Sequence, residues 1–265
     1  MKKSFLYALI ILIFCSWDSA IAKPGAIDSI FRTHQLRGSF LMLDYSANKF
    51  TVYNDARCRR RISPASTFKI PNTLIALELG IVKDTNYLFK WDGTPRRMDI
   101  WNKDMNLAEA MRVSCVPCYQ EIATKIGRER MQQWLDKFNY GNKCIGDSSQ
   151  IDKFWLNDSL KISQYEQINF LKKIYFSNLS AKKKNIDILK SIIIKDKNDK
   201  YTISAKTGTS LQKKLNGWYI GYVEKAGKVY FFATSIEANI PKEGLLTNER
   251  IDLTYDILRH LQIID

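Results

Sequence analysis

Histidine is nearly absent from this sequence of 265 residues, which contains only His34 and His260. Zinc sites in proteins are built mainly from cysteine and histidine ligands, so this composition argues against a metal centre. The two histidines are also distant in sequence from every motif described below, which makes a Ser-His-Asp triad very hard to build. If the protein carries a nucleophile, another kind of base has to activate it.

Long apolar runs are absent after residue 22. Before that point, Lys2 and Lys3 precede an apolar run from Phe5 to Cys15, and Ala20-Ile21-Ala22 forms a small-residue cleavage site. This pattern predicts a signal peptide over residues 1–22, and its apolar run is shorter than the about 20 residues of a membrane span. We therefore expect an exported, periplasmic protein with no stable membrane insertion after the leader is cleaved.

Acidic residues are in the minority, because 41 Lys and Arg oppose 27 Asp and Glu and give a formal net charge of +14. Basic runs occur at residues 57–61 and 182–184. Aromatic residues do not alternate with these runs, whereas proteins that bind single-stranded nucleic acid combine basic grooves with aromatic stacking platforms. We therefore interpret both runs as solvated surface and expect no nucleic-acid partner.

Four cysteines follow the leader: Cys58, Cys115, Cys118 and Cys144. An exported chain can form disulfides, but the sequence does not determine which cysteines pair. The Cys115-Val116-Pro117-Cys118 stretch has the spacing of a redox motif, yet the pattern places it inside a helix rather than at a helix start. We therefore interpret these two residues as buried thiols of a core helix.

The remaining residues, 23–265, predict a single domain without repeats or linkers. Residues rich in β-branched and aromatic side chains predict strands at both ends of the chain, at 40–44, 50–53, 201–206, 218–223 and 229–235. Apolar periodicity predicts helices from Leu107 and over 128–138, 164–175 and 249–261.

The order of these elements predicts an α/β fold of the α+β type, with an antiparallel sheet flanked by helices and a mostly helical second lobe. The sheet lobe would comprise about residues 23–63 and 178–265, and the helical lobe about residues 64–177. We expect the ligand site in the cleft between the two lobes.

The most informative stretch is Ser66-Thr67-Phe68-Lys69. Its Ser-x-x-Lys spacing begins at four serines, but only the Ser66 copy stands between Pro64-Ala65 and an apolar run typical of a helix. Residues three apart share a face at a helix start, so the Ser66 hydroxyl and the Lys69 amine can approach each other. Free backbone N–H groups at a helix N-terminus can also stabilise an anion that forms on an attacked carbonyl.

Three further motifs follow in order. Ser114-Cys115-Val116 supplies a second hydroxyl, and Tyr140-Gly141-Asn142 is a turn that we expect to border the cleft. Lys206-Thr207-Gly208 is expected to end a strand and is followed by Thr209. In this interpretation Gly208 lets a substrate lie close to the strand edge, while the Lys206 and Thr207 side chains reach for a carboxylate or a hydroxyl.

In this order, the motifs resemble those of the class D, or oxacillinase-type, serine β-lactamases over essentially the whole mature chain. The matching stretches include Phe154-Trp155-Leu156 and Gly217-Trp218-Tyr219-Ile220-Gly221 as well as the motifs above. Residues 89–93, Phe-Lys-Trp-Asp-Gly, are similar to a subgroup that includes carbapenem-hydrolysing members. Tyr-Gly-Asn separates class D from class A enzymes, which carry Ser-Asp-Asn.

The resemblance implies that Ser66 opens the lactam ring of a penicillin-type antibiotic and becomes acylated, which confers β-lactam resistance. It implies that Lys69 carries a carbamate made from carbon dioxide, as general base, and that Ser114 relays protons to the lactam nitrogen. No other cofactor and no metal is expected. Carbon dioxide adds to a neutral amine, and an apolar pocket lowers the pKa of a lysine, so the assignment is chemically consistent.

The resemblance also assigns the remaining site residues. The backbone N–H groups of Ser66 and Thr209 would form the oxyanion hole, and the indole N–H of Trp155 would donate to the carbamate. The carbamate pocket is expected to contain Phe68, Val116, Trp155 and Leu156. The substrate-binding residues are expected to be Tyr140, Lys206, Thr207, Gly208, Thr209 and Arg250, with Arg250 pairing with the substrate carboxylate.

Each of these residues has a plainer interpretation when it is taken alone. Ser114 fits a helix serine that bonds its own backbone, Trp155 fits an ordinary core residue, and Arg250 fits a surface arginine. Two other functions share the motifs, a penicillin-binding DD-peptidase and a β-lactam sensor domain, and both are acylated without turnover. Association into a homodimer also stays open.

Overall fold

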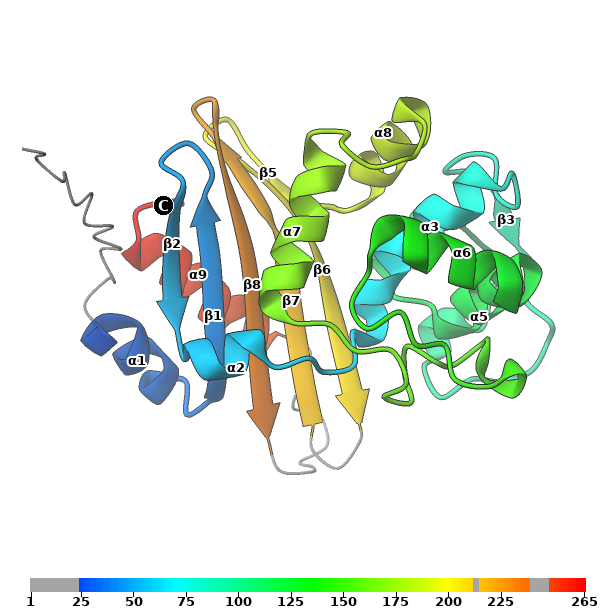
Figure 1. The fold of residues 1–265 in the computed structure, drawn as a ribbon, viewed down its shortest axis with the longest axis horizontal. Helices are drawn as coiled ribbons and strands as arrows, with labels where there is room; N and C mark the ends of the chain where they lie inside the picture. Colours follow the sequence, from blue (N-terminus) through cyan, green and yellow to red (C-terminus); the bar gives the residue numbers. More distant parts are fainter. Residues whose placement is uncertain (1–23, 212–214, 239–247) are drawn as a thin grey trace, which may run out of the picture.

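A computed structural model describes residues 24–211, 215–238 and 248–265, so the predicted signal peptide lies outside the described residues. Its main feature is a six-stranded antiparallel sheet with the strand order β2-β1-β8-β7-β6-β5. Both ends of the chain build this sheet, because β1 pairs with β8 (Figure 1). The strands are β1 (Arg37–Asp44), β2 (Lys49–Tyr53), β5 (Ile194–Lys197), β6 (Thr202–Leu211), β7 (Leu215–Lys225) and β8 (Lys228–Ala238).

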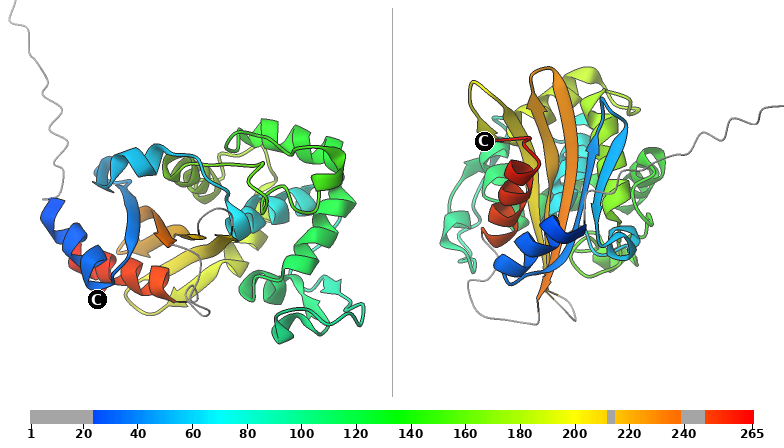
Figure 2. Two further views of the ribbon diagram at one scale, coloured as in Figure 1. Left: turned by 90° about the horizontal axis from the view of Figure 1, so that it is seen from below. Right: turned by 90° about the vertical axis from the view of Figure 1, so that its left-hand side faces the viewer.

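Helices cover both faces of the sheet, which confirms the predicted α+β fold class. Because side chains alternate across a strand, Phe40 and Met42 of β1 pack under α1 (Pro24–Thr33) and α9 (Glu249–His260) on one face. Leu41 and Leu43 enter the larger core on the other face, where α7 (Gln164–Tyr175) lies against β8 and β7. Figure 2 shows α1 and α9 together on their side of the sheet.

α2 (Asp55–Arg59) packs against β1 and α7. The other helices form a second layer beyond α7: α3 (Lys69–Glu78), α4 (Leu107–Arg112), α5 (Val116–Ile126), α6 (Arg128–Phe138) and α8 (Lys183–Ile192). The short elements are the 3-10 turns η1 (Ala65–Phe68), η2 (Asp99–Trp101) and η3 (Ser148–Gln150) and the paired strands β3 (Leu88–Phe89) and β4 (Met105–Asn106). The expected lobe boundary near residue 177 would place α7 in the helical lobe and α8 in the sheet lobe. In the structure α7 lies on the sheet and α8 packs on α3. Within the described ranges, no helix has the length and apolar character needed to span a membrane.

One edge of the sheet positions the site. β6 was expected to end at the Lys206-Thr207-Gly208 motif, but it continues to Leu211 and stays paired with β7, so that expectation is wrong. β5 pairs with β6 only as far as Ser204. Beyond that point the outer edge of β6 lies against η1, the turn that carries Ser66.

The start of α5 also corrects the sequence interpretation. α5 begins at Val116 and Cys115 is its N-cap, so the two cysteines lie at a helix start and not inside a helix. They are joined by a disulfide, Cys115–Cys118, and are not free thiols. The break arises because the chain turns sharply at Val113–Ser114, between α4 and α5. Cys58 is a buried free cysteine and Cys144 is an exposed one.

Candidate active site

Ser66 and Lys69 meet at the junction of η1 and α3, as their spacing predicts. Ser66 lies in η1, Lys69 is the first residue of α3, and the Lys69 Nζ donates to the Ser66 Oγ at 3.0 Å. Ser66 is half-buried, whereas only 1% of Lys69 is exposed. The hydroxyl is therefore open to a substrate while the amine beneath it is shielded from water.

The backbone around Ser66 is held by contacts from distant parts of the chain. Ala65 has a φ of +48°, a conformation that residues with a Cβ rarely adopt. The carbonyl oxygen of Trp155 accepts from the Ala65 N–H at 3.0 Å and from the Ser63 hydroxyl at 2.7 Å. The Trp218 indole donates to the Ser63 carbonyl at 2.8 Å. These contacts stabilise a strained turn beside the nucleophile.

Gln167 on α7 supports the same turn from below, and sequence reasoning missed it. Its amide donates to the Thr67 Oγ1 at 2.9 Å, and the Thr67 hydroxyl in turn donates to the Pro64 carbonyl at 2.7 Å. Gln164 and Gln167 are both buried residues of α7, and Gln164 bonds the sheet at Ser39 and Ala233. Two glutamines on the apolar stripe of an amphipathic helix were the signal that could have revealed this role.

Aromatic rings surround Lys69 and set its electrostatics. Phe68 stacks on Trp155 with a centroid distance of 5.5 Å, Phe154 meets Phe68 edge-on, and the Tyr119 ring lies 5.0 Å from the Lys69 Nζ. Burial in this environment lowers the pKa of Lys69 from 10.5 to about 7. A lysine with this pKa is partly neutral at neutral pH and can act as a base or a nucleophile.

The Trp155 indole places a hydrogen-bond donor in the apolar wall around Lys69. Trp155 is completely buried, and its Nε1 has no hydrogen-bond partner within the described part of the chain. A buried N–H without an acceptor is unfavourable, so an acceptor is expected to come from outside the chain. A carbamate on Lys69 has acceptor oxygens and needs a neutral amine for its formation. The residues present therefore fit this group.

Ser114 faces the site from the turn between α4 and α5. Its Oγ accepts from the Lys206 Nζ at 3.0 Å, and its φ is +55°. Ser114 therefore lies in a turn and not within a helix, so the plainer interpretation of a serine inside a helix does not hold. Burial, followed by the charges of Lys69, Lys195 and Arg250, holds the pKa of Lys206 well below its usual range. Lys206 is thus close enough to Lys69 for their charges to interact.

The Lys206-Thr207-Gly208 motif works differently from our expectation at its glycine. The Lys206 Nζ donates to the Thr207 carbonyl at 3.0 Å and lies 3.4 Å from the Thr207 Oγ1, so both side chains face the site. A Cβ on Gly208 would lie 2.8 Å from the Pro64 carbonyl oxygen and 3.1 Å from the Thr67 N. Gly208 therefore lets β6 approach η1, and not a substrate. Thr209, the next residue, is half-buried on the same strand.

Arg250 is buried and not a surface residue, because only 5% of it is exposed. Burial lowers the pKa of Arg250 to about 10, and the charge of Glu249 opposes this effect. Its side chain passes beside Gly217, where an added Cβ would lie 3.4 Å from the Arg250 Cδ. The Arg250 guanidinium is thus a buried cation whose charge also lowers the pKa of Lys206. Such a cation is suited to bind an anionic group.

Tyr140 does not lie where a substrate could touch it, which corrects its assignment to substrate binding. It is 1% exposed and packs against Phe68 and Phe170. The rest of its motif is structural too, since a Cβ on Gly141 would clash with the Lys161 carbonyl at 2.2 Å. Asn142 donates to the Ser159 carbonyl at 2.9 Å and accepts from the Lys161 N–H at 2.9 Å. The motif therefore fastens residues 159–161, which follow Trp155.

The last two predicted pocket residues, Val116 and Leu156, are both half-buried, and Leu156 packs against the large core. Val116 begins α5, two residues after Ser114, and Leu156 follows Trp155. Among the residues that the structure describes, no group of three or more His, Cys, Asp and Glu side chains could hold a metal ion.

Several known proteins are similar to this chain in sequence and in fold. The sequence profile of the penicillin binding protein transpeptidase domain matches residues 37–257. β-Lactamase OXA-5 of Pseudomonas aeruginosa is 41% identical over 237 residues, which cover 87% of this chain and 88% of that protein. The crystal structure of the class D β-lactamase YbXI from Nostoc superposes with a TM-score of 0.86 at 37% identity, covering 89% of this chain and 98% of that chain.

A regulatory protein is also similar. BlaR1 of Bacillus licheniformis is 36% identical over 211 residues, which cover 79% of this chain but only 35% of that protein. Sequences similar to this chain thus occur in β-lactamases and in a regulatory protein. The two β-lactamases above match this chain over nearly their whole length. The chain belongs to the class D serine β-lactamases, which are metal-independent hydrolases.

Proposed function

We propose that this protein hydrolyses penicillin-type β-lactams through an acyl-enzyme on Ser66, with a carbon dioxide-derived carbamate on Lys69 as general base, and so confers β-lactam resistance. The observation that carries the proposal is the contact of 3.0 Å between the Lys69 Nζ and the Ser66 Oγ, combined with the pKa of about 7 for Lys69. A hydroxyl beside a buried, partly neutral amine is a poised nucleophile.

Acylation follows from the positions of the side chains. The Ser66 Oγ loses its proton to the base at Lys69 and attacks the lactam carbonyl, and the C–N bond of the ring then breaks. The Ser114 hydroxyl, which Lys206 holds at 3.0 Å, relays this proton: it protonates the ring nitrogen and regains a proton from the base at Lys69. The backbone N–H groups of Ser66 and Thr209 stabilise the oxyanion, and the Lys206–Arg250 region attracts the substrate carboxylate.

Deacylation requires a water molecule to be activated at the same place. A carbamate supplies an anionic oxygen base next to the ester, and Trp155 is the residue whose free indole N–H would orient it. The aromatic wall of Phe68 and Trp155 excludes bulk water and keeps the unmodified amine neutral. This step separates a hydrolase from a sensor or a DD-peptidase, which stay acylated.

The proposal includes the cellular setting expected from the sequence. A leader over residues 1–22 would export the protein to the periplasm, where β-lactams reach their targets. Expression of the full chain in a susceptible Gram-negative host should raise the inhibitory concentration of a penicillin. The Ser66→Ala variant should lose this protection.

The direct test is intact-mass measurement with a slowly hydrolysed penicillin. We expect an adduct of one substrate mass on the wild type that disappears with time, together with hydrolysis of a chromogenic cephalosporin. Ser66→Ala should form no adduct. Ser46→Ala is a matched control, because Ser46 has the same spacing to a lysine but lies on an exposed turn. It should behave like the wild type.

Two outcomes would contradict the proposal. An adduct that survives in Ser66→Ala would place the nucleophile elsewhere. An adduct on the wild type that never decays would instead favour the sensor domain, which the similarity to BlaR1 keeps as the second candidate, or the DD-peptidase.

A further inference from the structure

The turn that carries Ser114 is held in an unfavourable conformation. Ser114 has a φ of +55°, in the left-handed region that disfavours residues with a Cβ. Such a conformation persists only where its surroundings fix it. The conformation of this turn sets the position of the Ser114 Oγ, and this oxygen accepts from the Lys206 Nζ at 3.0 Å. The restraints on the turn therefore bear on catalysis.

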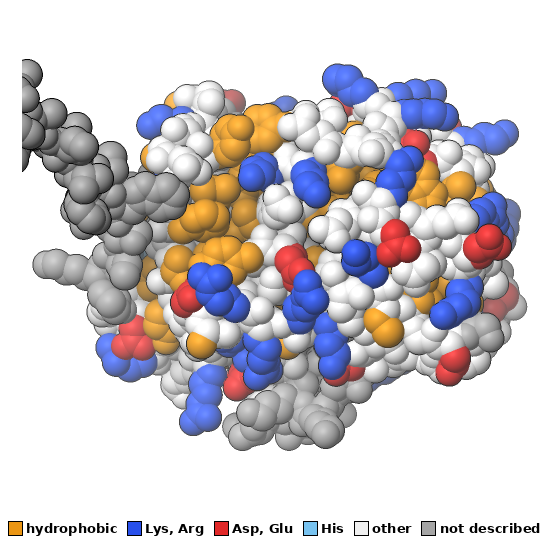
Figure 3. Space-filling model, viewed as in Figure 1, with side chains coloured by type: hydrophobic (Ala, Val, Ile, Leu, Met, Phe, Trp, Pro, Cys, Tyr) orange, Lys and Arg blue, Asp and Glu red, His pale blue; other side chains and the backbone are white. Residues whose placement is uncertain are grey.

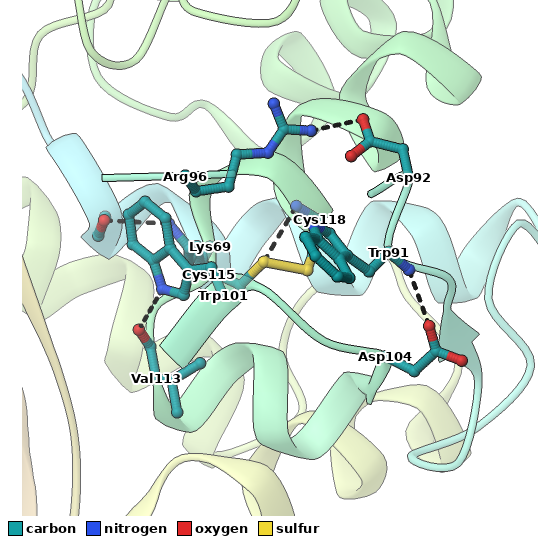
Figure 4. Close-up of a disulfide and its surroundings, with 10 residues drawn as sticks. Lys69, Trp91, Asp92, Arg96, Trp101, Asp104, Val113, Cys115 and Cys118 are labelled. Atoms are coloured by element: carbon teal, nitrogen blue, oxygen red, sulfur yellow. Dashed lines mark hydrogen bonds and ion pairs between the residues drawn. A yellow bond between two sulfur atoms is a disulfide. The ribbon is translucent and has the colours of Figure 1, made fainter. Parts of the chain in front are cut away.

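Restraints act on the turn from three directions. From α4, the Met111 carbonyl accepts from the Ser114 N–H at 3.3 Å and the Ala110 carbonyl accepts from the Cys115 N–H at 2.9 Å. From the preceding loop, the Trp101 indole donates to the Val113 carbonyl at 3.2 Å. From α5, the Cys115–Cys118 disulfide ties the residue after Ser114 to the first turn of the helix (Figure 4).

The disulfide takes the place of an ordinary helix cap. Helices are usually capped by a side-chain oxygen that accepts from a backbone N–H, but the N-cap of α5 is Cys115, whose sulfur accepts from the Cys118 N–H at 3.2 Å. Sulfur is a weak acceptor, so this hydrogen bond alone would hold the cap loosely. The covalent bond joins residues only three apart, and a loop this short restricts the unfolded chain little. Its main effect is therefore local.

We propose that the Cys115–Cys118 disulfide is a positioning element for Ser114, and that turnover depends on its being formed. The inference rests on the proposed function, in which Ser114 delivers a proton to the lactam nitrogen. Reduction breaks the S–S bond and adds two electrons and two protons. A phosphine or dithiol reductant supplies the electrons and is oxidised in exchange. The freed Cys115 then no longer fixes the turn.

The sulfur atoms can be reached from a side that is not the catalytic one. Cys115 and Cys118 are 1% and 7% exposed. Both line a pocket with a volume of about 250 Å³, together with Trp91, Trp101 and Pro117. Ser66, Lys69, Ser114 and Lys206 are not among its lining residues. A small reductant can therefore act on the disulfide without entering the substrate site.

The experiment compares the oxidised enzyme, the phosphine-reduced enzyme and a Cys115→Ala/Cys118→Ala variant, all in a Cys144→Ser background that removes the exposed thiol. We expect kcat to fall by about 10- to 100-fold on reduction, as for a catalytic group displaced by about 1 Å, while KM changes little. Reoxidation should restore kcat. The melting temperature should shift by only a few degrees. The double variant should have the kcat of the reduced enzyme, and the reductant should not change it.

A second variant separates positioning from general stability. Because the disulfide acts through Ser114, the acylation rate of Ser114→Ala, measured by mass, should be insensitive to reduction. Equal kcat in the oxidised and reduced enzyme, or an equal loss in Ser114→Ala, would overturn the inference. Unfolding on reduction would also overturn it, because the disulfide would then be needed for the stability of the whole fold and not for the position of Ser114. If the oxidised parent formed no adduct at all, the proposed function would fail, and this inference with it.

Discussion

Lys69 combines two properties that a lysine in water does not have. Its side chain is shielded by aromatic rings, and burial lowers its pKa to about 7. The unfolded chain holds this proton up to about pH 10.4, so between pH 7 and 10.4 the unfolded state binds more protons than the folded one. The cost of burying Lys69 is therefore greatest below pH 7 and decreases as the pH rises through this window.

The same titration controls the chemistry of the site. With a pKa of about 7, the neutral fraction of the amine rises from roughly 3% at pH 5.5 to nearly all at pH 8.5. In bicarbonate-depleted buffer we expect activity to increase over this range with a midpoint near 7. Added bicarbonate should restore activity on the acid side, because more carbon dioxide shifts the carbamate equilibrium. ¹³C NMR with labelled bicarbonate should show a carbamate signal that Lys69→Ala lacks.

Trp155→Phe tests the indole N–H within this prediction, because it keeps a ring in the aromatic wall. A hydrogen bond to a charged group is typically worth about 1.5–3 kcal/mol. The variant should therefore need a bicarbonate concentration at least roughly 10-fold higher than the wild type for the same activity. Trp134→Phe is the matched control, since Trp134 lies on α6 and is only half-buried. Full activity in carbon dioxide-free buffer, without a carbamate signal, would mean that Lys69 works as a plain amine.

At the scale of elements, the site depends on how closely β6 approaches η1. Gly208 leaves no room for a side chain, because a Cβ would lie 2.8 Å from the Pro64 carbonyl oxygen. The same turn is tied to α7 through Gln167 and Thr67. A strand, a 3-10 turn and a helix thus fix the position of the Ser66 hydroxyl together.

Gly208→Ala should push β6 away from η1. Overpacking of this kind typically costs about 1–3 kcal/mol, which corresponds to a melting temperature lower by roughly 2–12 °C in a domain of this size. The acylation rate should fall as well, because the turn that carries Ser66 is displaced. Gly25→Ala is the control, since an added Cβ there meets nothing within 4 Å. A Gly208→Ala enzyme with unchanged stability and acylation would contradict this packing argument.

The elements that the sequence predicted well are those whose pattern is set by the core. The bounds of α6 and α7 agree with the prediction to the residue. α7 carries a capping box between Ser163 and Glu166, and α6 ends at Asn139 in the left-handed conformation. Local signals of this kind are readable without tertiary information.

The elements that were misjudged are those that serve the site. β6 continues through Thr207-Gly208-Thr209-Ser210, which lacks apolar alternation because part of this stretch lies against η1. The start of α5 was hidden because its cap is a disulfide-bonded cysteine and not a serine or an aspartate. The motif order indicated Ser66, Lys69, Ser114 and Lys206. The roles of Gly208, Tyr140 and Gln167 needed their three-dimensional neighbours.

At the scale of the whole molecule, the charge is strongly positive. The formal net charge is +14, and Lys and Arg side chains are spread widely over the face shown in Figure 3. Such a field attracts anionic substrates from a distance, but salt screens it over about 8–10 Å at physiological ionic strength. The buried Arg250, whose charge acts on Lys206, is screened much less. The general field and the local site can therefore be separated by experiment.

Arg250→Ala and Lys184→Ala each remove one positive charge, so they change the general field equally. Lys184 is exposed on α8, whereas Arg250 is 5% exposed and influences the pKa of Lys206. Losing a charge-assisted partner of the substrate carboxylate costs about 1.5–3 kcal/mol, so Arg250→Ala should lower kcat/KM by roughly 10- to 150-fold. Lys184→Ala should change kcat/KM by about twofold or less, and only at low salt.

Arg250→Lys distinguishes charge from geometry at the same position. It keeps the cation but loses the planar fork that binds a carboxylate through two hydrogen bonds, so its kcat/KM should lie between those of the wild type and Arg250→Ala. Melting temperatures measured in parallel separate a loss of binding from a loss of folding, which matters for a side chain as buried as this one. If Arg250→Ala and Lys184→Ala lowered kcat/KM equally, and high salt abolished both effects, the long-range field and not Arg250 would account for the capture of the substrate.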